Sequence, residues 1–230
     1  MRQMEFKELN TFLIGVKMRK VLSLSGESQT GKDSLAAPLI AQGWVHMSFA
    51  HNLKTMCSKV FNLNDNQVDT QPGKSEQLNP PISFGVEEAI KVICYMAQTH
   101  QIEELDLEQF KTPKILNTPR EVLQYVGTDI CRKIIPNYHV DVVRQQIQLR
   151  PHENIILTDA RFPNEREMLK REFDAILIRI KRPNFTPDVP TGHTSETSLG
   201  TDNEYDQIII NDSTLLELQK QALEFNKGMK

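Results

Sequence analysis

A glycine-rich segment near the N-terminus constrains the fold of this chain more than any other feature. Residues 25–34 read SGESQTGKDS, in which two glycines and a lysine have the spacing GxxxxGK. The apolar run VLSL precedes this segment, and residues 33–42 have helical composition up to Gly43. A strand, a glycine loop and a helix in this order predict a phosphate-binding loop. The alternative is an ordinary strand–turn–helix connection that matches the spacing by chance.

Each residue of the loop has an expected role. Gly26 and Gly31 allow successive backbone N–H groups to point at phosphate oxygens. Lys32 would place a positive charge on the β- and γ-phosphates of a nucleotide, and Ser28 and Thr30 would add hydroxyl or amide contacts. The segment therefore predicts a site for a nucleoside triphosphate.

The residue after the lysine departs from the usual pattern. A serine or threonine there normally binds Mg²⁺, whereas this chain has Asp33, with Ser34 one position later. A carboxylate can also bind the ion directly or through water. Without metal it would repel a triphosphate. We therefore expect Asp33 and Ser34 to form the metal site.

Strands and helices alternate along the chain. This alternation predicts an α/β fold of three layers, in which helices cover both faces of a central, mostly parallel five-stranded sheet. The expected strands are residues 20–24, 44–49, 154–159, 175–180 and 207–210. Residues 1–17 look like an N-terminal extension, and residues 18–230 like a single domain. An insertion at about 62–118 would form a lid of helices and loops, of which residues 62–85 read as a long polar surface loop.

Composition narrows the class of protein. The chain has 230 residues and a net charge of −3, so it lacks the basic excess of a general nucleic-acid binder. Its three cysteines form no CxxC pair and suggest neither a disulfide framework nor a zinc site. No apolar run approaches the ~20 residues of a membrane span. We expect a cytoplasmic protein that binds a small molecule and neither nucleic acid nor membrane, with a homodimer left open.

A second charged cluster follows a later expected strand. Asp159 and Arg161 stand at the end of the run NIILT, with Glu165 soon after. Ligands on parallel sheets bind beyond the carboxyl ends of the strands, where the phosphate loop also lies. Asp159 could orient Mg²⁺ or hydrogen-bond a nucleotide, and Arg161 could hold a phosphate. A salt bridge between Asp159 and Arg161 is the structural alternative.

The middle of the chain carries further candidates. Arg120 lies in the first turn of a helix that Thr118 is expected to cap, and it is the arginine best placed for an anion. Gly127 and Thr128 interrupt the apolar stripe of that helix. Glycine costs ~1 kcal/mol there relative to alanine, so either a ligand or another helix is expected to approach closely. His139 is more typical of a surface or core residue than of a catalyst.

Several segments together resemble the deoxynucleoside monophosphate kinases of tailed phages. They are LSGxxxxGKDS at the phosphate loop, FAHNLK ending at Lys54, LQYVGTD at residues 123–129, TDARFxxE at residues 158–165 and HTSE at residues 193–196. The resemblance extends from about Met18 to near the C-terminus. It implies a P-loop kinase-like fold, Mg²⁺ and ATP as donor, and a deoxynucleoside 5′-monophosphate as acceptor. A phage-encoded enzyme of this kind would act in the host cytoplasm.

The resemblance also implies roles for individual residues. Gly31, Asp33 and Ser34 correspond to ATP positions of the family, and the predicted substrate positions are Gln29, Lys54, Arg120, Gly127, Thr128, His139, Asp159, Arg161 and Glu165. Lys32, Arg120, Asp159 and Arg161 are the predicted catalytic residues. His139 replaces a tryptophan of the family pattern, and Gln29 replaces a basic residue, so the range of substrates could differ.

Two other functions stay open at this point. One is a P-loop kinase for another phosphorylated small molecule, of the phosphomevalonate or dephospho-CoA type. The other is a nucleotide-binding ATPase without a small acceptor, which usually needs a glutamate after the strand-end aspartate. Here Ala160 follows Asp159, which argues against the ATPase.

Overall fold

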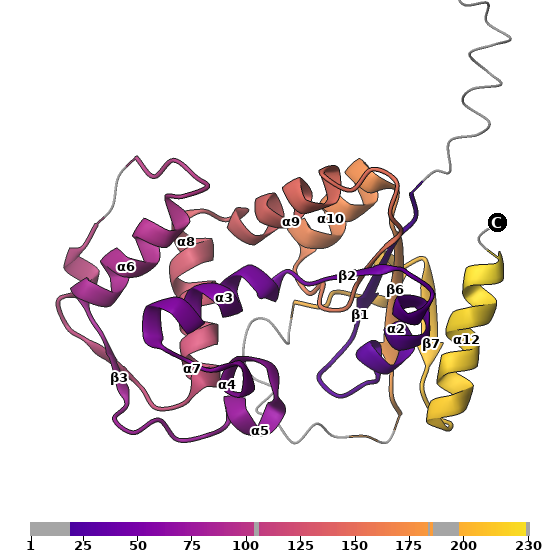
Figure 1. The fold of residues 1–230 in the computed structure, drawn as a ribbon, viewed down its shortest axis with the longest axis horizontal. Coiled ribbons are helices and arrows are strands. Elements are labelled where there is room, and N and C mark those ends of the chain that lie inside the picture. The colour runs from indigo at the N-terminus through magenta and orange to yellow at the C-terminus, as the bar shows by residue number, and fades with distance from the viewer. Residues whose placement is uncertain (1–18, 104–105, 184, 186–197, 229–230) are drawn as a thin grey trace, which may run out of the picture.

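The structure is a computed structural model of the chain. It describes all residues except 1–18, 104–105, 184, 186–197 and 229–230. The expected extension at residues 1–17 and the HTSE segment at residues 193–196 lie outside the described residues. Two units lie side by side in Figure 1: a sheet with helices on both faces, and a second unit built mainly of helices.

The central sheet has five strands in the order β2-β5-β1-β6-β7, and all of its pairings are parallel. The strands are β1 (Val21–Ser25), β2 (Val45–Met47), β5 (Ile155–Leu157), β6 (Ile176–Lys181) and β7 (Gln207–Ile210). The prediction of a mostly parallel five-stranded sheet in an α/β fold is confirmed. Each expected strand forms, with bounds that differ by a few residues.

Helices cover both faces of the sheet, as the buried character of its strands requires. Successive side chains of a strand point to opposite faces. Leu22 and Leu24 accordingly pack against α2 (Lys32–Ala41) and α12 (Leu215–Gly228), whereas Val21 packs against α9 (Tyr138–Gln148) and α10 (Pro163–Phe173). The parallel arrangement brings the carboxyl ends of all five strands to one edge.

The second unit has a hydrophobic core of its own. Met56, Phe84, Met96 and Val122 are fully buried in it, together with Tyr138 of α9. Its elements are α3 (Ala50–Phe61), α4 (Asp65–Asp69), α5 (Gln71–Lys74), the hairpin of β3 (Ile82–Phe84) and β4 (Lys114–Leu116), α6 (Val86–Met96), α7 (Pro119–Gln124), a π-helix (Tyr125–Cys131) and α8 (Arg132–Ile134). We call these elements the helical unit. The predicted insertion at 62–118 forms only part of it.

The prediction of a long polar loop at residues 62–85 is wrong. Asn64 and Gln67 form a capping box that starts α4, and the Thr70 side chain accepts a hydrogen bond from the N–H of Gly73 to start α5. Leu63 and Val68 bury their side chains in the helical unit. Short capped turns anchored by single apolar residues look polar in sequence, which explains the error.

Gly127 lies where two helical segments approach closely. A Cβ atom on Gly127 would stand 2.6 Å from Cδ2 of Leu53 in α3. The seven-residue π-helix that contains Gly127 follows α7 directly. Glycine at this position therefore permits the close contact between α3 and the π-helix.

We expect Gly127→Ala to lower the free energy of unfolding by about 1–2 kcal/mol, because the added methyl group displaces the Leu53 side chain. Urea denaturation followed by circular dichroism measures the change. In a Leu53→Ala background the same substitution should cost nothing, since the steric conflict is gone and alanine favours helix. An equal cost in both backgrounds would contradict this packing.

Candidate active site

The phosphate-binding loop is fixed against the ends of β6 and β7. Gly26 has φ of 154°, and a Cβ atom there would stand 2.5 Å from the carbonyl oxygen of Ile180. Gly31 has φ of 100°, and its Cβ would stand 2.7 Å from Nδ2 of Asn211. Asn211 also donates a hydrogen bond of 2.9 Å to the carbonyl of Thr30. Both glycines are required for the loop to lie this close to the sheet.

The interior of the loop is suited to an anion. Gln29 adopts the left-handed region with φ of 62°, and within the described part of the chain the N–H groups of Gln29 and Gly31 donate no hydrogen bond. Lys32 is buried, and its Nζ donates to the carbonyls of Gly26 at 2.9 Å and Glu27 at 2.5 Å. Alternating backbone conformations with N–H groups left over form an anion-binding concavity.

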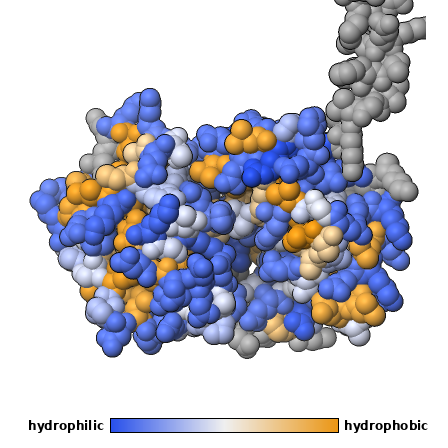
Figure 2. All heavy atoms as spheres, in the orientation of Figure 1, coloured by the Kyte–Doolittle hydropathy of each residue, from blue (hydrophilic) through white to orange (hydrophobic). Residues whose placement is uncertain are grey.

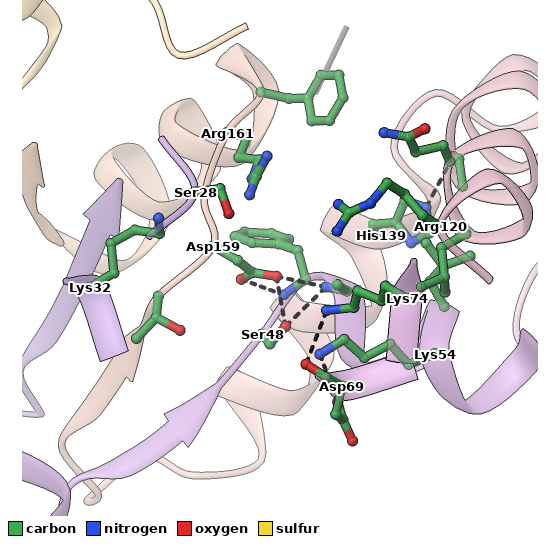
Figure 3. Close-up of a pocket in the computed structure, with 18 of the residues that line it drawn as sticks. Ser28, Lys32, Ser48, Lys54, Asp69, Lys74, Arg120, His139, Asp159 and Arg161 are labelled. Atoms are coloured by element: carbon green, nitrogen blue, oxygen red, sulfur yellow. Dashed lines mark hydrogen bonds and ion pairs between the residues drawn. The ribbon is translucent and has the colours of Figure 1, made fainter. Parts of the chain in front are cut away.

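A cavity of about 360 Å³ lies between this loop and the helical unit. Figure 2 shows the surface hollowed between the two units, and Figure 3 shows side chains from both reaching into the hollow. Twelve of the predicted site residues line it: Ser28, Gln29, Lys32, Asp33, Lys54, Arg120, Gly127, Thr128, His139, Asp159, Arg161 and Glu165. Segments far apart in sequence thus meet as predicted.

Four predicted residues are not among the described residues that line the cavity. Gly26 and Gly31 shape the loop from behind. The Thr30 hydroxyl donates within the loop, to the carbonyl of Glu27 at 2.9 Å, and Ser34 is half-buried in the first turn of α2. Of the two predicted metal residues, only Asp33 lies at the cavity.

Positive charge gathers on the walls of the cavity. Lys54, Lys74, Arg120 and Arg161 all line it (Figure 3). Burial, and then the charges of Lys54, Arg120 and, more weakly, Arg161, lower the pKa of Lys74 to about 8. Lys54 is balanced by Asp69, at 2.9 Å between Nζ and Oδ1, and the lysine lowers the pKa of that carboxyl. Cations crowded to this degree predict a polyanionic ligand.

The Asp159 carboxylate begins helix α3. Its Oδ1 accepts from the N–H of Phe49 at 2.9 Å, and its Oδ2 accepts from the Ser48 hydroxyl at 2.6 Å and the N–H of Ala50 at 2.9 Å. Asp159 therefore joins the sheet edge to the helical unit.

Glu165 also has a structural environment. It is fully buried, accepts from the N–H groups of Arg161 and Phe162, and pairs with Arg132. Burial raises the pKa of its carboxyl, while Arg132 and the two N–H groups oppose that shift. Glu165 thereby orders the backbone that presents Arg161 to the cavity.

His139 is buried in the cavity wall. Burial, and then the nearby charge of Arg132, lower its pKa to about 4, so the ring is neutral at pH 7. Its Nε2 lies 3.3 Å from the carbonyl of Gly127, and Nδ1 has no hydrogen-bond partner among the described residues. The expectation of a core histidine is met, and the ring lines the pocket as well.

Sequence reasoning missed two residues of α5. Gln71 Nε2 donates to Oγ of Ser28 at 3.5 Å, and Gln71 Oε1 accepts from Arg120 at 2.7 Å. Lys74 follows one turn later and also faces the cavity. The signal that could have revealed α5 was Thr70, a capping residue placed before Gln71 and Pro72.

The site fits Mg²⁺ only together with a phosphorylated ligand. Within the described ranges, no group of three or more His, Cys, Asp or Glu side chains is arranged to hold a metal ion. Kinases commonly hold Mg²⁺ through one or two carboxylates, water and the substrate phosphates. Asp33 suits this arrangement because its exposed side chain stands at the cavity beside Lys32.

Comparison with known proteins now identifies the family. The model of the family described as deoxynucleotide monophosphate kinase matches residues 86–222, more than half of the chain. The chain belongs to the deoxynucleotide monophosphate kinase family. It is therefore a phosphotransferase that acts on deoxynucleoside monophosphates, as the sequence predicted.

Two viral relatives have names that agree with this assignment. A protein of Acanthamoeba polyphaga mimivirus, provisionally named a deoxynucleotide monophosphate kinase, is 30% identical over 216 residues, which cover 88% of this chain and 94% of the relative. The deoxynucleoside-5′-monophosphate kinase of Escherichia phage T5 is 20% identical, with 79% of this chain and 86% of the relative covered. The dephospho-CoA kinase of Campylobacter jejuni superposes with a TM-score of 0.46 at 11% identity, covering 93% and 99% of the two chains.

The described helices include none that is both long and apolar enough to cross a membrane.

We expect Asp159→Asn to lower the free energy of unfolding by about 1–3 kcal/mol. The NH2 group of asparagine cannot accept the hydrogen bonds that a carboxylate oxygen accepts at the same place. Urea denaturation measures the loss. Asp174→Asn, on the exposed residue after α10, is the matched control and should stay within about 0.5 kcal/mol of wild type. Unchanged stability with abolished turnover would instead give Asp159 a mainly chemical role.

Proposed function

We propose that this deoxynucleotide monophosphate kinase transfers the γ-phosphoryl group of ATP, bound with Mg²⁺, to the 5′-phosphate of a deoxynucleoside monophosphate. The products are the deoxynucleoside diphosphate and ADP. The observation that carries the proposal is the cavity of about 360 Å³, bounded on one side by the phosphate-binding loop and on the other by the cations of the helical unit.

The donor would bind at the loop. The N–H groups of Gln29 and Gly31 and the positive end of α2 would hold phosphate oxygens, and Lys32 would exchange its contacts with loop carbonyls for the β- and γ-phosphates. Asp33 would hold Mg²⁺ with the phosphates. The ion supplies positive charge to the phosphates during transfer.

The acceptor phosphate would bind across the cavity. Arg120 and Arg161 present guanidinium groups suited to two hydrogen bonds with a phosphate. Lys54 adds a third cation at the foot of the cavity, near Asp69 (Figure 3). Gly127, Thr128 and His139 form the wall beyond Arg120 and would contact the nucleoside.

The reaction needs no general base. An oxygen of the acceptor phosphate, already an anion at pH 7, bonds to the γ-phosphorus while the bond to the β-phosphate oxygen breaks, and that electron pair stays on ADP. Positioning and cationic charge supply the catalysis of such a transfer. A neutral, buried His139 is consistent with a reaction that has no proton to remove.

The viral relatives support a proposal about where the reaction takes place. Both named relatives are viral, so we propose that the enzyme acts in the cytoplasm of an infected cell. The homodimer stays a prediction.

ADP release from ATP, measured by a coupled assay with Mg²⁺ and a panel of deoxynucleoside and other monophosphates, tests the proposal. We expect release to depend on a deoxynucleoside monophosphate. Lys32→Ala should lower kcat by about 100-fold or more, because it removes the loop cation. Lys220→Ala, on the exposed face of α12, is the matched control. ADP release independent of every such acceptor would refute the proposal.

The metal site is tested by ATP binding with and without Mg²⁺, measured by calorimetry. In wild type the Asp33 carboxylate repels metal-free ATP, so Mg²⁺ should strengthen binding strongly. Asp33→Thr should reduce that benefit by about 10-fold, in proportion to one lost charge interaction. Glu27→Gln, on the exposed loop carboxylate away from the cavity, serves as control. An unchanged benefit would make Asp33 a surface carboxylate.

A further inference from the structure

Helix α5 presents one face to the cavity. Gln71 and Lys74 are three residues apart, so they lie on the same side of this single turn, and both line the cavity. Gly73 fixes the turn against α4, because a Cβ atom there would stand 2.1 Å from the carbonyl oxygen of Asn66. The hydrogen bond from the Gly73 N–H to Thr70 Oγ1, at 3.0 Å, holds the start of the turn. The inward face is therefore built firmly into the helical unit.

This face lies between the two halves of the site. Gln71 contacts Ser28 of the phosphate-binding loop with its amide nitrogen, at 3.5 Å, and Arg120 with its amide oxygen, at 2.7 Å. A residue that joins the donor loop to the acceptor arginine marks where the phosphoryl group must pass. Lys74 stands one turn from that point.

The ammonium group of Lys74 has an unusual environment. Its Nζ donates to the backbone carbonyl of Asp69 at 3.2 Å, and among the described residues no carboxylate forms an ion pair with it. The charged groups that face it are Lys54 of α3, Asp69 of α4, Arg120 of α7 and Arg161 after β5. Asp69 is already paired with Lys54. Burial among three cations brings the pKa of Lys74 to about 8, as expected of a cation whose counter-ion is the ligand.

We propose that Lys74 is a catalytic residue that binds the phosphoryl group during its transfer. The inference rests on the proposed function and adds to it a cation carried by α5. The ammonium stabilises negative charge on the oxygens of the γ-phosphorus while one P–O bond forms and the other breaks, and it keeps its proton throughout.

Steady-state kinetics with ATP and the preferred deoxynucleoside monophosphate provide the first test. Lys74→Met should lower kcat about 100-fold, the scale of losing one group that stabilises the transition state, with the KM for ATP within about threefold of wild type. Lys74→Arg should keep most of the activity. Its activity should also persist to higher pH than that of wild type, because a guanidinium does not titrate there. Lys111→Met, on an exposed lysine before β4 that does not line the cavity, is the matched control.

Proton uptake gives a second readout that does not depend on turnover. At pH 8 the phosphate of the nucleotide is fully ionised, since its second pKa is about 6. Binding of the monophosphate should raise the pKa of Lys74, so calorimetry in two buffers of different ionisation enthalpy should record uptake for wild type and none for Lys74→Arg. The Tm of Lys74→Met should equal or exceed that of wild type, because a desolvated charge is removed.

The outcomes separate the two proposals. If ADP release by wild type does not depend on an acceptor, the proposed function is refuted. If ADP release by wild type depends on the acceptor but the kcat of Lys74→Met stays within threefold of the wild-type kcat, only the role of Lys74 is refuted. If the Tm of Lys74→Met falls and Lys74→Arg loses as much activity as Lys74→Met, Lys74 has a structural role, and its catalytic role is also refuted.

Discussion

The start of helix α3 depends on a carboxylate from a distant part of the chain. The first N–H groups of any helix lack partners within the helix, and the residue at the cap of α3, Phe49, has no side chain that can accept a hydrogen bond. Asp159, 110 residues away from Phe49 in sequence, accepts three hydrogen bonds there. This contact positions α3, which carries Lys54 and packs against Gly127 through Leu53. Much of the acceptor side is therefore held in place by one side chain of the sheet edge.

The cavity is electrostatically incomplete without its ligands. Carboxylates balance Lys54 and Arg132, whereas Lys74 remains among cations and has a lowered pKa. Because its pKa is lower when folded than the ordinary lysine value, folding is disfavoured while Lys74 is charged. That penalty is fully present below about pH 8 and is relieved as the pH rises toward the ordinary value. A bound polyanion would relieve it at pH 7, so ligand binding and folding stability are linked at this residue.

Sequence reasoning recovered the sheet and most of the cavity wall because both follow from local patterns. Apolar strands that end in loops predict the sheet, and parallel topology brings Lys32, Asp159 and Arg161 to one edge. It could not recover contacts that arise only from packing. The capping role of Asp159 and the burial of Glu165 both depend on partners far away in sequence. Lys74 was missed because the polar stretch around it reads as a loop, although single capping residues fold it into helices.

The separate core of the helical unit has an evolutionary consequence. Its buried side chains, from Met56 to Val142, form a cluster distinct from the two that flank the sheet. Substitutions in this core are far from those under the phosphate-binding loop, and their effects on stability should add independently. Each side of the cavity can thus accept substitutions in its own core without disturbing the other side. His139 of α9 lies at the cavity wall, 3.3 Å from the carbonyl of Gly127, so it is one position where a change in the helical unit reaches the surface of the cavity.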